Sequence, residues 1–406
     1  MKTFRKTLVL FVVFLMGAYF VPLFFDWDKK EPILLPEETS SNEESESSTL
    51  PQSSADQSLI PAVGFANYVG LAVDDFLVEY GEPVKVETLS DMSEIWIYGI
   101  DSTDYLQVIV ENYVVTEVLV LGTSVEIPPF KIGMEQEKMY PLASFHPKFV
   151  VPFENQTIQI NLNENELNNR PLIAFDNQTY AVITMDSQTN TVIGIQYMTN
   201  EKLLSSGLYD ITPFSSVVQE PVKQLNPAAL EKVKTQQTIR YINVMREKMG
   251  LIPLEESLIL EAVGNDLFEF HQSSTEQDTQ KETESQEESS EDALIISDEA
   301  SVEEVDESEA GENNNQEART QDTNEAFEPL NETTIQSFLE EEAIDLDKVR
   351  LLYQIAPTNP SVYALQWFTL AEYRDILMDD SMRRIGITYQ GDELLVILDD
   401  GFEISL

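Results

Sequence analysis

The stretch Ile242-Asn-Val-Met-Arg-Glu-Lys-Met-Gly-Leu-Ile-Pro-Leu254 decides how the C-terminal half of this chain folds. Apolar residues recur at helical spacing up to this stretch and within it, which predicts an amphipathic helix with one buried face. Gly250 suits the left-handed conformation that ends many helices, and Pro253 cannot continue one. We therefore expect two helices joined by a short turn, the first starting at Asn226-Pro227 and the second reaching Phe270.

Residues 61–212, which precede this stretch, are predicted to form an α+β domain of two related halves. Each half has an apolar residue followed by glycine, then a helix, and later an antiparallel hairpin of alternating strands. The matching segments are Val69-Gly70 with Tyr105–Val110 and Val114–Leu121, and Ile132-Gly133 with Tyr180–Thr184 and Val192–Tyr197. Repetition in this order predicts an internal duplication. The alternative is that alternating hairpins simply look alike.

The N-terminus carries an uncharged run of about eighteen residues from Leu8 to Phe25, which spans roughly 27 Å as a helix. Basic residues precede the run and Asp26 follows it, so the positive-inside rule places the N-terminus in the cytoplasm and the C-terminal part outside the cell. No small-residue cleavage pattern follows the run. Residues 1–28 are therefore predicted to be a cytoplasmic tip and a single-pass anchor in the cell membrane. A cleaved signal peptide is the alternative.

The 406-residue chain contains 73 acidic and 24 basic residues, for a formal net charge of -49. This charge excludes nucleic acid as a partner, because phosphate binding needs clustered Lys and Arg. The chain has no cysteine, which excludes disulfides, thiolate catalysis and cysteine-based zinc sites. Small secreted eukaryotic domains usually rely on disulfides, so a cysteine-free exported chain is typical of a bacterial envelope protein, especially a Gram-positive one.

Two segments have the composition of disordered chain. Residues 29–60 are rich in Glu, Ser, Pro and Gln and are predicted to be a stalk that spaces the folded part from the membrane. Residues 272–330 are strongly acidic and contain few apolar side chains, so they cannot bury enough surface to offset the entropy of ordering. This second segment is predicted to be a disordered acidic insertion within a folded domain over residues 222–406.

The opening stretch resembles the start of the SCP/CAP superfamily domain of secreted proteins, where Asn and, three positions on, Arg precede Gly-Leu-x-Pro-Leu. The segment Ala364–Leu377, followed by Arg384-Ile-Gly-Ile-Thr388, resembles a later family motif with Trp, a His-Arg turn, Ile-Leu and a strand with Ile-Gly. The resemblance implies an α-β-α sandwich over residues 222–406. The matching residues, for which we expect structural roles, are Asn243, Arg246, Gly250, Pro253, Trp367, Arg374 and Gly386.

Residues 61–212 resemble the CAP-associated N-terminal domain that precedes such modules in Gram-positive bacteria. The segments that carry this resemblance are Tyr80-Gly-Glu-Pro83, Trp96-Ile-Tyr98, Tyr105-Leu-Gln-Val108, Asn169-Arg-Pro171 and Leu203-Leu-Ser205. The predicted fold class is therefore α+β, with this domain followed by a degenerate SCP/CAP sandwich that the acidic insertion interrupts.

SCP/CAP domains that look active carry two His and two acidic residues in a central cleft, a set that can hold a divalent metal. In this chain the corresponding His positions fall at Leu267 and Tyr373. His271, about one turn beyond the first position, is the remaining metal candidate, and its place near a helix end favours a structural role. His146 lies in a loop without a paired ligand. We therefore predict no catalytic residue, no metal site and no cofactor.

We expect the outer part to be a non-enzymatic binding or scaffolding module. Its partner would be an envelope protein, a cell-wall component or a lipid-like molecule, and the sequence neither chooses among these nor names the ligand-binding residues. The alternative is a metal-dependent hydrolase or protease-like SCP/CAP protein with a rearranged site, which needs His and carboxylates together in one cleft. A third interpretation makes the N-terminal domain the functional part and the sandwich its structural partner.

Overall fold

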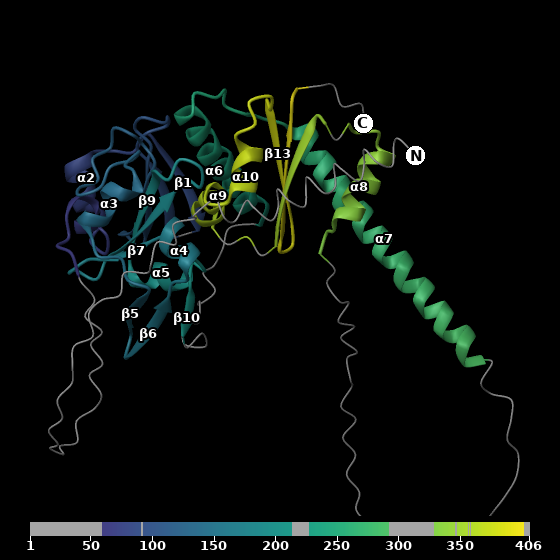
Figure 1. Ribbon diagram of the computed structural model, residues 1–406, viewed down its shortest axis with the longest axis horizontal. Coiled ribbons are helices and arrows are strands. Elements are labelled where there is room, and N and C mark those ends of the chain that lie inside the picture. Colours follow the sequence, from purple (N-terminus) through teal and green to yellow (C-terminus); the bar gives the residue numbers. More distant parts are fainter. Residues whose placement is uncertain are drawn as a thin grey trace, which may run out of the picture. The chain divides into compact units, whose positions relative to one another are not determined.

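The computed structural model describes residues 59–90, 92–212, 227–291, 329–345, 347–355, 357 and 359–401, with the backbone alone described over 275–291 (Figure 1). The predicted anchor, nearly all of the predicted stalk and residues 292–328 of the predicted insertion lie outside this part of the chain. Within the described part, no helix combines the length and the apolar character needed to cross a membrane.

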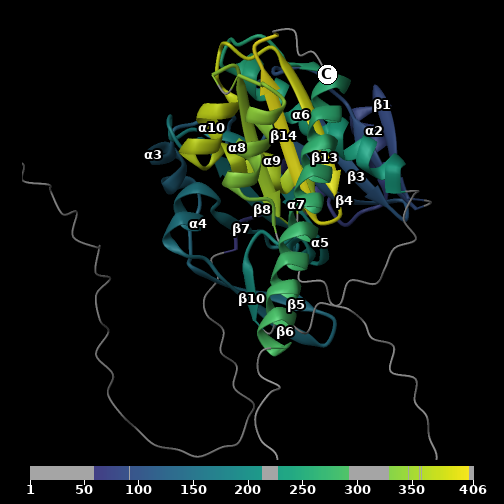
Figure 2. The same cartoon turned by 90° about the vertical axis from the view of Figure 1, so that its right-hand side faces the viewer.

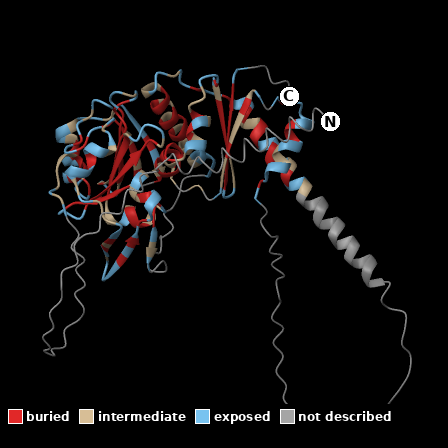
Figure 3. Ribbon diagram, in the orientation of Figure 1, coloured by how far each residue is buried: buried red, intermediate tan, exposed pale blue. Residues whose placement is uncertain are grey.

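The N-terminal region, residues 59–212, is organised around a seven-stranded antiparallel sheet in the order β1-β2-β3-β4-β9-β8-β7. Its strands are β1 Lys85–Ser90, β2 Ser93–Ile97, β3 Leu106–Glu111, β4 Val114–Val120, β7 Leu172–Ala174, β8 Tyr180–Met185 and β9 Val192–Met198. β-Branched residues are frequent in the central strands, where they pack well on a pleated surface. Every residue of β8 and β9 is buried, so both faces of the sheet are covered there (Figure 3).

The two halves of this region repeat the same backbone contacts. Gly70 and Gly133 both have positive φ, 85° and 82°. Each donates its backbone N–H to a hairpin strand at 2.7 Å, Gly70 to Val115 O and Gly133 to Val192 O. The hairpins β3–β4 and β8–β9 then pair through β4 and β9 at the centre of the sheet. The predicted repeat is confirmed, and both sites favour glycine because side chains with a Cβ rarely adopt this φ.

One face of this sheet is covered by short helices of the same region, which bury Phe65, Val73, Phe76 and Met139 against it. These helices are η1 Gly64–Asn67, α2 Val73–Tyr80, α3 Gln136–Met139 and η2 Tyr140–Leu142. A smaller sheet in the order β10-β6-β5 extends the region, with α5 packed on β5 and α4 on β8. The bounds of these elements are β5 Lys148–Phe153, β6 Gln156–Asn161, α4 Glu164–Asn169, α5 Asn200–Ser205 and β10 Asp210–Thr212.

The described residues of the C-terminal region, 227–401, form a four-stranded sheet between two helical layers. The strand order is β11-β13-β14-β12, with β11 parallel to β13 and the other pairs antiparallel. α7 and α8 pack on one face, and α6, α9 and α10 on the other (Figure 1, Figure 2). This is the α-β-α sandwich that the resemblance predicts. The bounds are α6 Pro227–Lys248, β11 Glu255–Glu256, α7 Leu258–Glu291, α8 Glu332–Glu341, β12 Val349–Ile355, α9 Pro360–Phe368, α10 Ala371–Leu377, β13 Arg384–Gln390 and β14 Glu393–Asp399.

α7 lies close to β13 because glycines stand at their contact. A Cβ added to Gly386 would lie 2.4 Å from the Cβ of Leu260, and one added to Gly264 would lie 2.3 Å from Thr388 Oγ1. Real Cβ atoms essentially never approach so closely, so any larger residue at Gly386 would push the helix away from the sheet.

One motif segment spans two helices, and one predicted boundary needs correction. The segment Ala364–Leu377 is divided between α9 and α10, because Leu370 adopts an extended conformation (φ -114°, ψ 119°) and the hydroxyl of Thr369 bonds back to Gln366 O. The disordered insertion expected from residue 272 does not begin there, since α7 continues to Glu291. Glu, Gln and Lys are good helix formers, and extending an existing helix costs far less than nucleating one.

The turn after α6 forms as the opening stretch predicts. Gly250 has a φ of 74° directly after the helix, and Pro253 lies between α6 and β11. The side chain of Asn243 holds the returning chain: its Nδ2 donates to Leu254 O at 3.0 Å and its Oδ1 accepts from Leu254 N at 2.7 Å. This two-way bond fixes the angle at which the chain leaves α6.

Arg246 ties the same turn to the chain between α10 and β13. Its side chain is 0% exposed, and Nε donates to Ile252 O at 2.9 Å. Nη1 donates to Leu377 O at 2.7 Å and to Asp379 O at 3.1 Å, and Nη2 donates to Met382 O at 3.3 Å. The guanidinium therefore serves carbonyls from two segments that are far apart in the sequence.

Replacing Arg246 by Met is expected to lower the free energy of unfolding by about 3–5 kcal/mol, because several buried carbonyls would lose a charged donor. Arg246→Lys should also destabilise, since one ammonium cannot reach both segments. The matched control is Lys232→Met on an exposed position of α6, which should change stability by less than about 0.5 kcal/mol. Urea unfolding of the full-length variants measures this, and an Arg246→Met protein as stable as the control would contradict the anchoring role.

Candidate functional site

The second face of the seven-stranded sheet is covered by α6 and α9, and we call this contact surface the seam. One apolar cluster crosses it, joining Ile97, Leu119 and Ile193 of the sheet to Met245 of α6 and Trp367 of α9. Figure 1 shows α6 and α9 next to the strands that they cover. The two regions therefore share a core.

Polar side chains also lie in the seam, on strands that are otherwise apolar. Gln107 on β3, Glu117 on β4 and Gln196 on β9 are at most 4% exposed. Gln107 Oε1 accepts from the Tyr241 hydroxyl of α6 at 2.9 Å. Buried polar groups need hydrogen-bond partners, so each of these side chains restricts how the C-terminal region can pack on the sheet.

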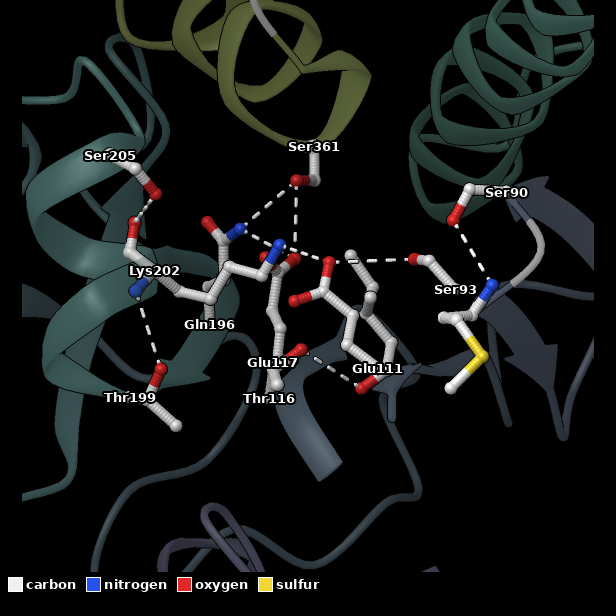
Figure 4. Close-up of polar contacts among 12 residues, drawn as sticks. Ser90, Ser93, Glu111, Thr116, Glu117, Gln196, Thr199, Lys202, Ser205 and Ser361 are labelled. Carbon is white, nitrogen blue, oxygen red and sulfur yellow. Dashed lines mark hydrogen bonds and ion pairs between the residues drawn. The ribbon is translucent and has the colours of Figure 1, made fainter. Parts of the chain in front are cut away.

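Glu117 is a buried carboxylate of the seam (Figure 4). Its Oε1 accepts from Gln196 Nε2 at 2.7 Å and from Ser361 Oγ at 3.2 Å. Ser361 lies in the first turn of α9, where the helix dipole favours negative charge. Burial nevertheless raises the pKa of Glu117 above its ordinary value, and the positive charge of Lys202 offsets this only in part.

A cavity of about 210 Å³, which we call the seam pocket, lies between the sheet and the two helices. Its apolar wall comes from both regions and consists of Leu89, Ile95, Ile109, Leu230 and Pro360. The uncharged polar groups that line it are Ser90, Ser93, Gln237 and Asn359. Because β1–β3 form one side and α6 and the start of α9 the other, neither region forms this pocket alone.

The seam pocket is also lined by Glu111 and Lys234. Glu111 is paired with Lys202, with 2.5 Å between Nζ and Oε1, and also accepts from Ser93 Oγ at 3.4 Å (Figure 4). Lys234 Nζ lies 5.8 Å from the centroid of the Tyr389 ring, and among the described residues it has no ion pair. Burial lowers the pKa of Lys234, with the exposed Glu231 acting in the opposite direction. The lining therefore carries one negative charge that is ion-paired and one positive charge that has no ion pair among the described residues.

A second polar contact holds the turn between β8 and β9 against α10. Arg374 Nε donates to Asp186 Oδ2 at 2.7 Å, and Nη1 donates to Gln188 Oε1 at 2.7 Å. Burial of Asp186 opposes ionisation, but the Arg374 guanidinium and the backbone N–H groups of Gln188 and Thr189 outweigh it, so the pKa of Asp186 is lowered. Arg374, one of the motif residues, thus joins the two regions.

The remaining motif residue, Trp367, is 3% exposed, and its Nε1 donates to Gln354 Oε1 of β12 at 2.8 Å. With Asn243 and Arg246 at the α6 turn and Arg374 at the seam, the polar side chains of the motif are all bonded within the fold. None of them lines the seam pocket.

The positions where the resemblance would place histidines lie on opposite faces of the C-terminal sheet. Leu267 is fully buried in the cluster beneath α7 and α8, whereas Tyr373 packs against the cluster that α6 and α9 share. His271 is 6% exposed on α7, and His146 lies in the loop before β5. Over the described ranges, no group of three or more His, Asp and Glu side chains is arranged to hold a metal ion.

Sequence interpretation missed the seam pocket and the role of Glu117. A usable signal was present: β3 and β4 are apolar on both faces and still contain Gln107 and Glu117. A polar residue inside a doubly buried strand requires a partner from a covering element. The identity of that element, however, follows only from the packing of α9, which lies more than 200 residues further along the chain.

Known proteins with this architecture include a cysteine-rich secretory protein from Staphylococcus aureus. Its crystal structure superposes with a TM-score of 0.61 at 15% identity, covering 84% of this chain and 97% of that one. An extracellular protein containing an SCP domain from Bacillus anthracis gives a TM-score of 0.56 at 17% identity, covering 90% and 99%. At these sequence identities, the structural similarity establishes the fold of this chain and nothing further.

The N-terminal region is assigned by its sequence, because residues 69–209 match the family model of the CAP-associated N-terminal domain. Residues 69–209 thus resemble the CAP-associated N-terminal family, and the chain shares its fold with proteins that carry an SCP domain. The uncharacterized membrane protein YlbC of Bacillus subtilis is 22% identical to it over 258 residues, which cover 63% of this chain and 71% of that protein. The seam thus lies between a CAP-associated domain and an SCP/CAP-fold domain.

The buried carboxylate should make the stability of the protein depend on pH. Because burial raises the pKa of Glu117, the stability associated with its neutral form is fully present below the ordinary carboxyl pKa of 4.5 and is lost as the pH rises through the folded-state pKa. Glu117→Gln keeps the shape and cannot ionise. We expect the wild type to lose stability relative to Glu117→Gln as the pH rises from about 4 to about 8.

Chemical unfolding of both full-length proteins at several pH values measures this difference. Glu201→Gln, an exposed substitution on α5, is the charge-matched control for the high net charge of the chain. If the free energies of unfolding of wild type and Glu117→Gln differed by the same amount over the whole pH range, burial would not raise the pKa of Glu117.

Proposed function

We propose that this protein is a membrane-anchored, non-enzymatic binding module that acts outside the cytoplasm, with its two domains working as one body. The observation that carries the proposal is the use made of Arg374. In the motif that this segment resembles, a histidine precedes the arginine, whereas here Tyr373 precedes it and Arg374 is bonded to Asp186 and Gln188. A guanidinium that is bonded in this way through Nε and Nη1 positions a neighbouring domain.

The seam pocket supports a binding role. Ligand pockets often lie at domain interfaces and combine an apolar wall with a few polar groups that orient the ligand. The seam pocket has this composition, because apolar side chains such as Leu89 and Leu230 line it together with Lys234 and Gln237. A ligand that binds in a pocket shared by two domains also stabilises the contact between those domains.

The membrane assignment rests on two observations. The uncharged run from Leu8 to Phe25 has the length of a membrane span, with basic residues before it and acidic residues after it. The relative from Bacillus subtilis is named a membrane protein. A tether confines the folded domains to the neighbourhood of the bilayer, which suits local binding of an envelope component.

Metal titration tests the non-enzymatic assignment. We expect full-length protein to bind Zn²⁺ or Mn²⁺ only weakly and in a salt-sensitive way, because a chain with a net charge of -49 attracts cations without a defined site. His271→Ala should behave as the wild type does, and so should His146→Ala as the matched control. Isothermal titration calorimetry gives affinity and stoichiometry.

Tight binding of one metal ion per chain, abolished by His271→Ala and retained by His146→Ala, would instead establish the alternative function. The protein would then be a metal-dependent hydrolase-like member of the family with a rearranged site, since a histidine–metal centre is what such chemistry requires.

A further inference from the structure

The seam pocket has, beside an apolar wall, a positive charge that forms no ion pair with any side chain that the structure describes. Glu111 is neutralised by Lys202, at 2.5 Å, whereas Lys234 has no ion pair among the described residues. The Tyr389 ring, 5.8 Å away, holds the ammonium in place without removing its charge. Burial lowers the pKa of Lys234, as expected for an ammonium that lacks a counter-ion. An anionic group in the pocket would supply that counter-ion.

The size of the pocket limits the ligand. A volume of about 210 Å³ equals that of about seven water molecules in the liquid. One apolar amino-acid side chain with an attached carboxylate has a size that suits this space. The apolar wall and Lys234 match the two halves of such a group.

The strand beside the pocket favours a peptide as the source of this group. Leu89 and Ser90, which line the pocket, end β1, and β1 is the edge strand of the seven-stranded sheet. Among the described residues, no strand pairs with its outer side. An extended peptide can add to such an edge through main-chain hydrogen bonds while its terminal residue enters a pocket.

We propose that the seam pocket binds the carboxy-terminal residue of a peptide, with its apolar side chain against Leu89, Ile95 and Leu230 and its carboxylate at Lys234. Ser90, Ser93 and Gln237 lie in the same lining and supply neutral hydrogen-bonding groups. This inference rests on the proposed binding function and specifies its ligand. A peptide terminus would contact both domains, because Leu89 and Ile95 come from the sheet, whereas Leu230 and Lys234 come from α6.

The test uses full-length protein in lipid nanodiscs and a fluorescent peptide that ends in Ala-Val-Leu with a free carboxylate. Fluorescence polarisation should show saturable binding at least about tenfold tighter than for the same peptide with a carboxy-terminal amide, because the amide cannot pair with an ammonium. Lys234→Met should weaken binding of the acid by about tenfold or more and leave the amide unchanged. Lys234→Arg should restore most of the affinity.

Lys232→Met, on the same helix and exposed, is the matched control and should bind as the wild type does. Thermal unfolding of each variant separates a local effect from misfolding. Equal affinities for acid and amide, or equal behaviour of Lys234→Met and Lys232→Met, would overturn the assignment. Displacement by 4-methylpentanoate at concentrations equal to the peptide would overturn the peptide as ligand and leave a free apolar carboxylate in its place.

Mass spectrometry of the peptide recovered from the same samples separates this inference from the proposed function. Intact peptide that binds in a Lys234-dependent way supports both. Intact peptide that does not bind refutes the pocket assignment while the non-enzymatic function stands. Peptide cleaved by the wild type would refute the non-enzymatic function, whatever the contrast between Lys234→Met and Lys232→Met shows about binding.

Discussion

The seven-stranded sheet is apolar on both faces, and this constraint determines how the two domains of the protein are joined. Ile97, Leu119 and Ile193 are at most 3% exposed because α6 and α9 lie over them. A fully buried side chain of this size contributes about 1.5–3 kcal/mol. A CAP-associated domain without its neighbour would expose these residues together, as a patch that monomeric soluble proteins avoid. The two domains therefore stabilise each other.

Apolar contact brings the domains together but is not directional, so the polar contacts decide their orientation. Glu117 meets Ser361 at one place in the seam, Arg374 meets Asp186 at another, and Arg240 of α6 pairs with Glu87 of β1 at 2.5 Å. Displacing one domain along the other would leave these buried groups without partners, which costs more than the bonds themselves contribute. These polar contacts also define the seam pocket, because they hold its two sides in a fixed relative position.

The motif residues of the SCP/CAP-fold domain support the frame of the domain. Arg246 bonds to carbonyls of the α6 turn and of the chain between α10 and β13. Asn243 closes the α6 turn, and Trp367 joins α9 to β12. At Tyr373 and Leu267 the chain has side chains that pack in apolar clusters. A frame of this kind can persist while the chemistry at its centre changes, because folding and catalysis depend on different atoms of the motif. The proposed ligand site accordingly lies at the seam, where the second domain contributes new groups.

Local signals in the sequence by themselves determined the elements and much of the fold. Gly250 and Pro253 predicted the end of α6, and Gly70 and Gly133 marked a repeat that recurs in the backbone hydrogen bonds. Such features depend on φ preferences and periodicity within a few residues, which the sequence expresses directly. The extended conformation of Leu370, which separates α9 from α10, has no signal of this kind in the sequence.

Only the tertiary structure decided the site. The pocket joins Leu89 and Glu111 to Lys234 and Asn359, which are separated by more than 100 residues at two places along the chain. In a chain with 73 acidic residues, the composition gives no reason to select Lys234 as a binding group. Its charge is uncompensated because Glu111 is already paired with Lys202 in the folded protein. Long-range contacts of this kind arise from shared burial of distant segments, and no local pattern in the sequence records them.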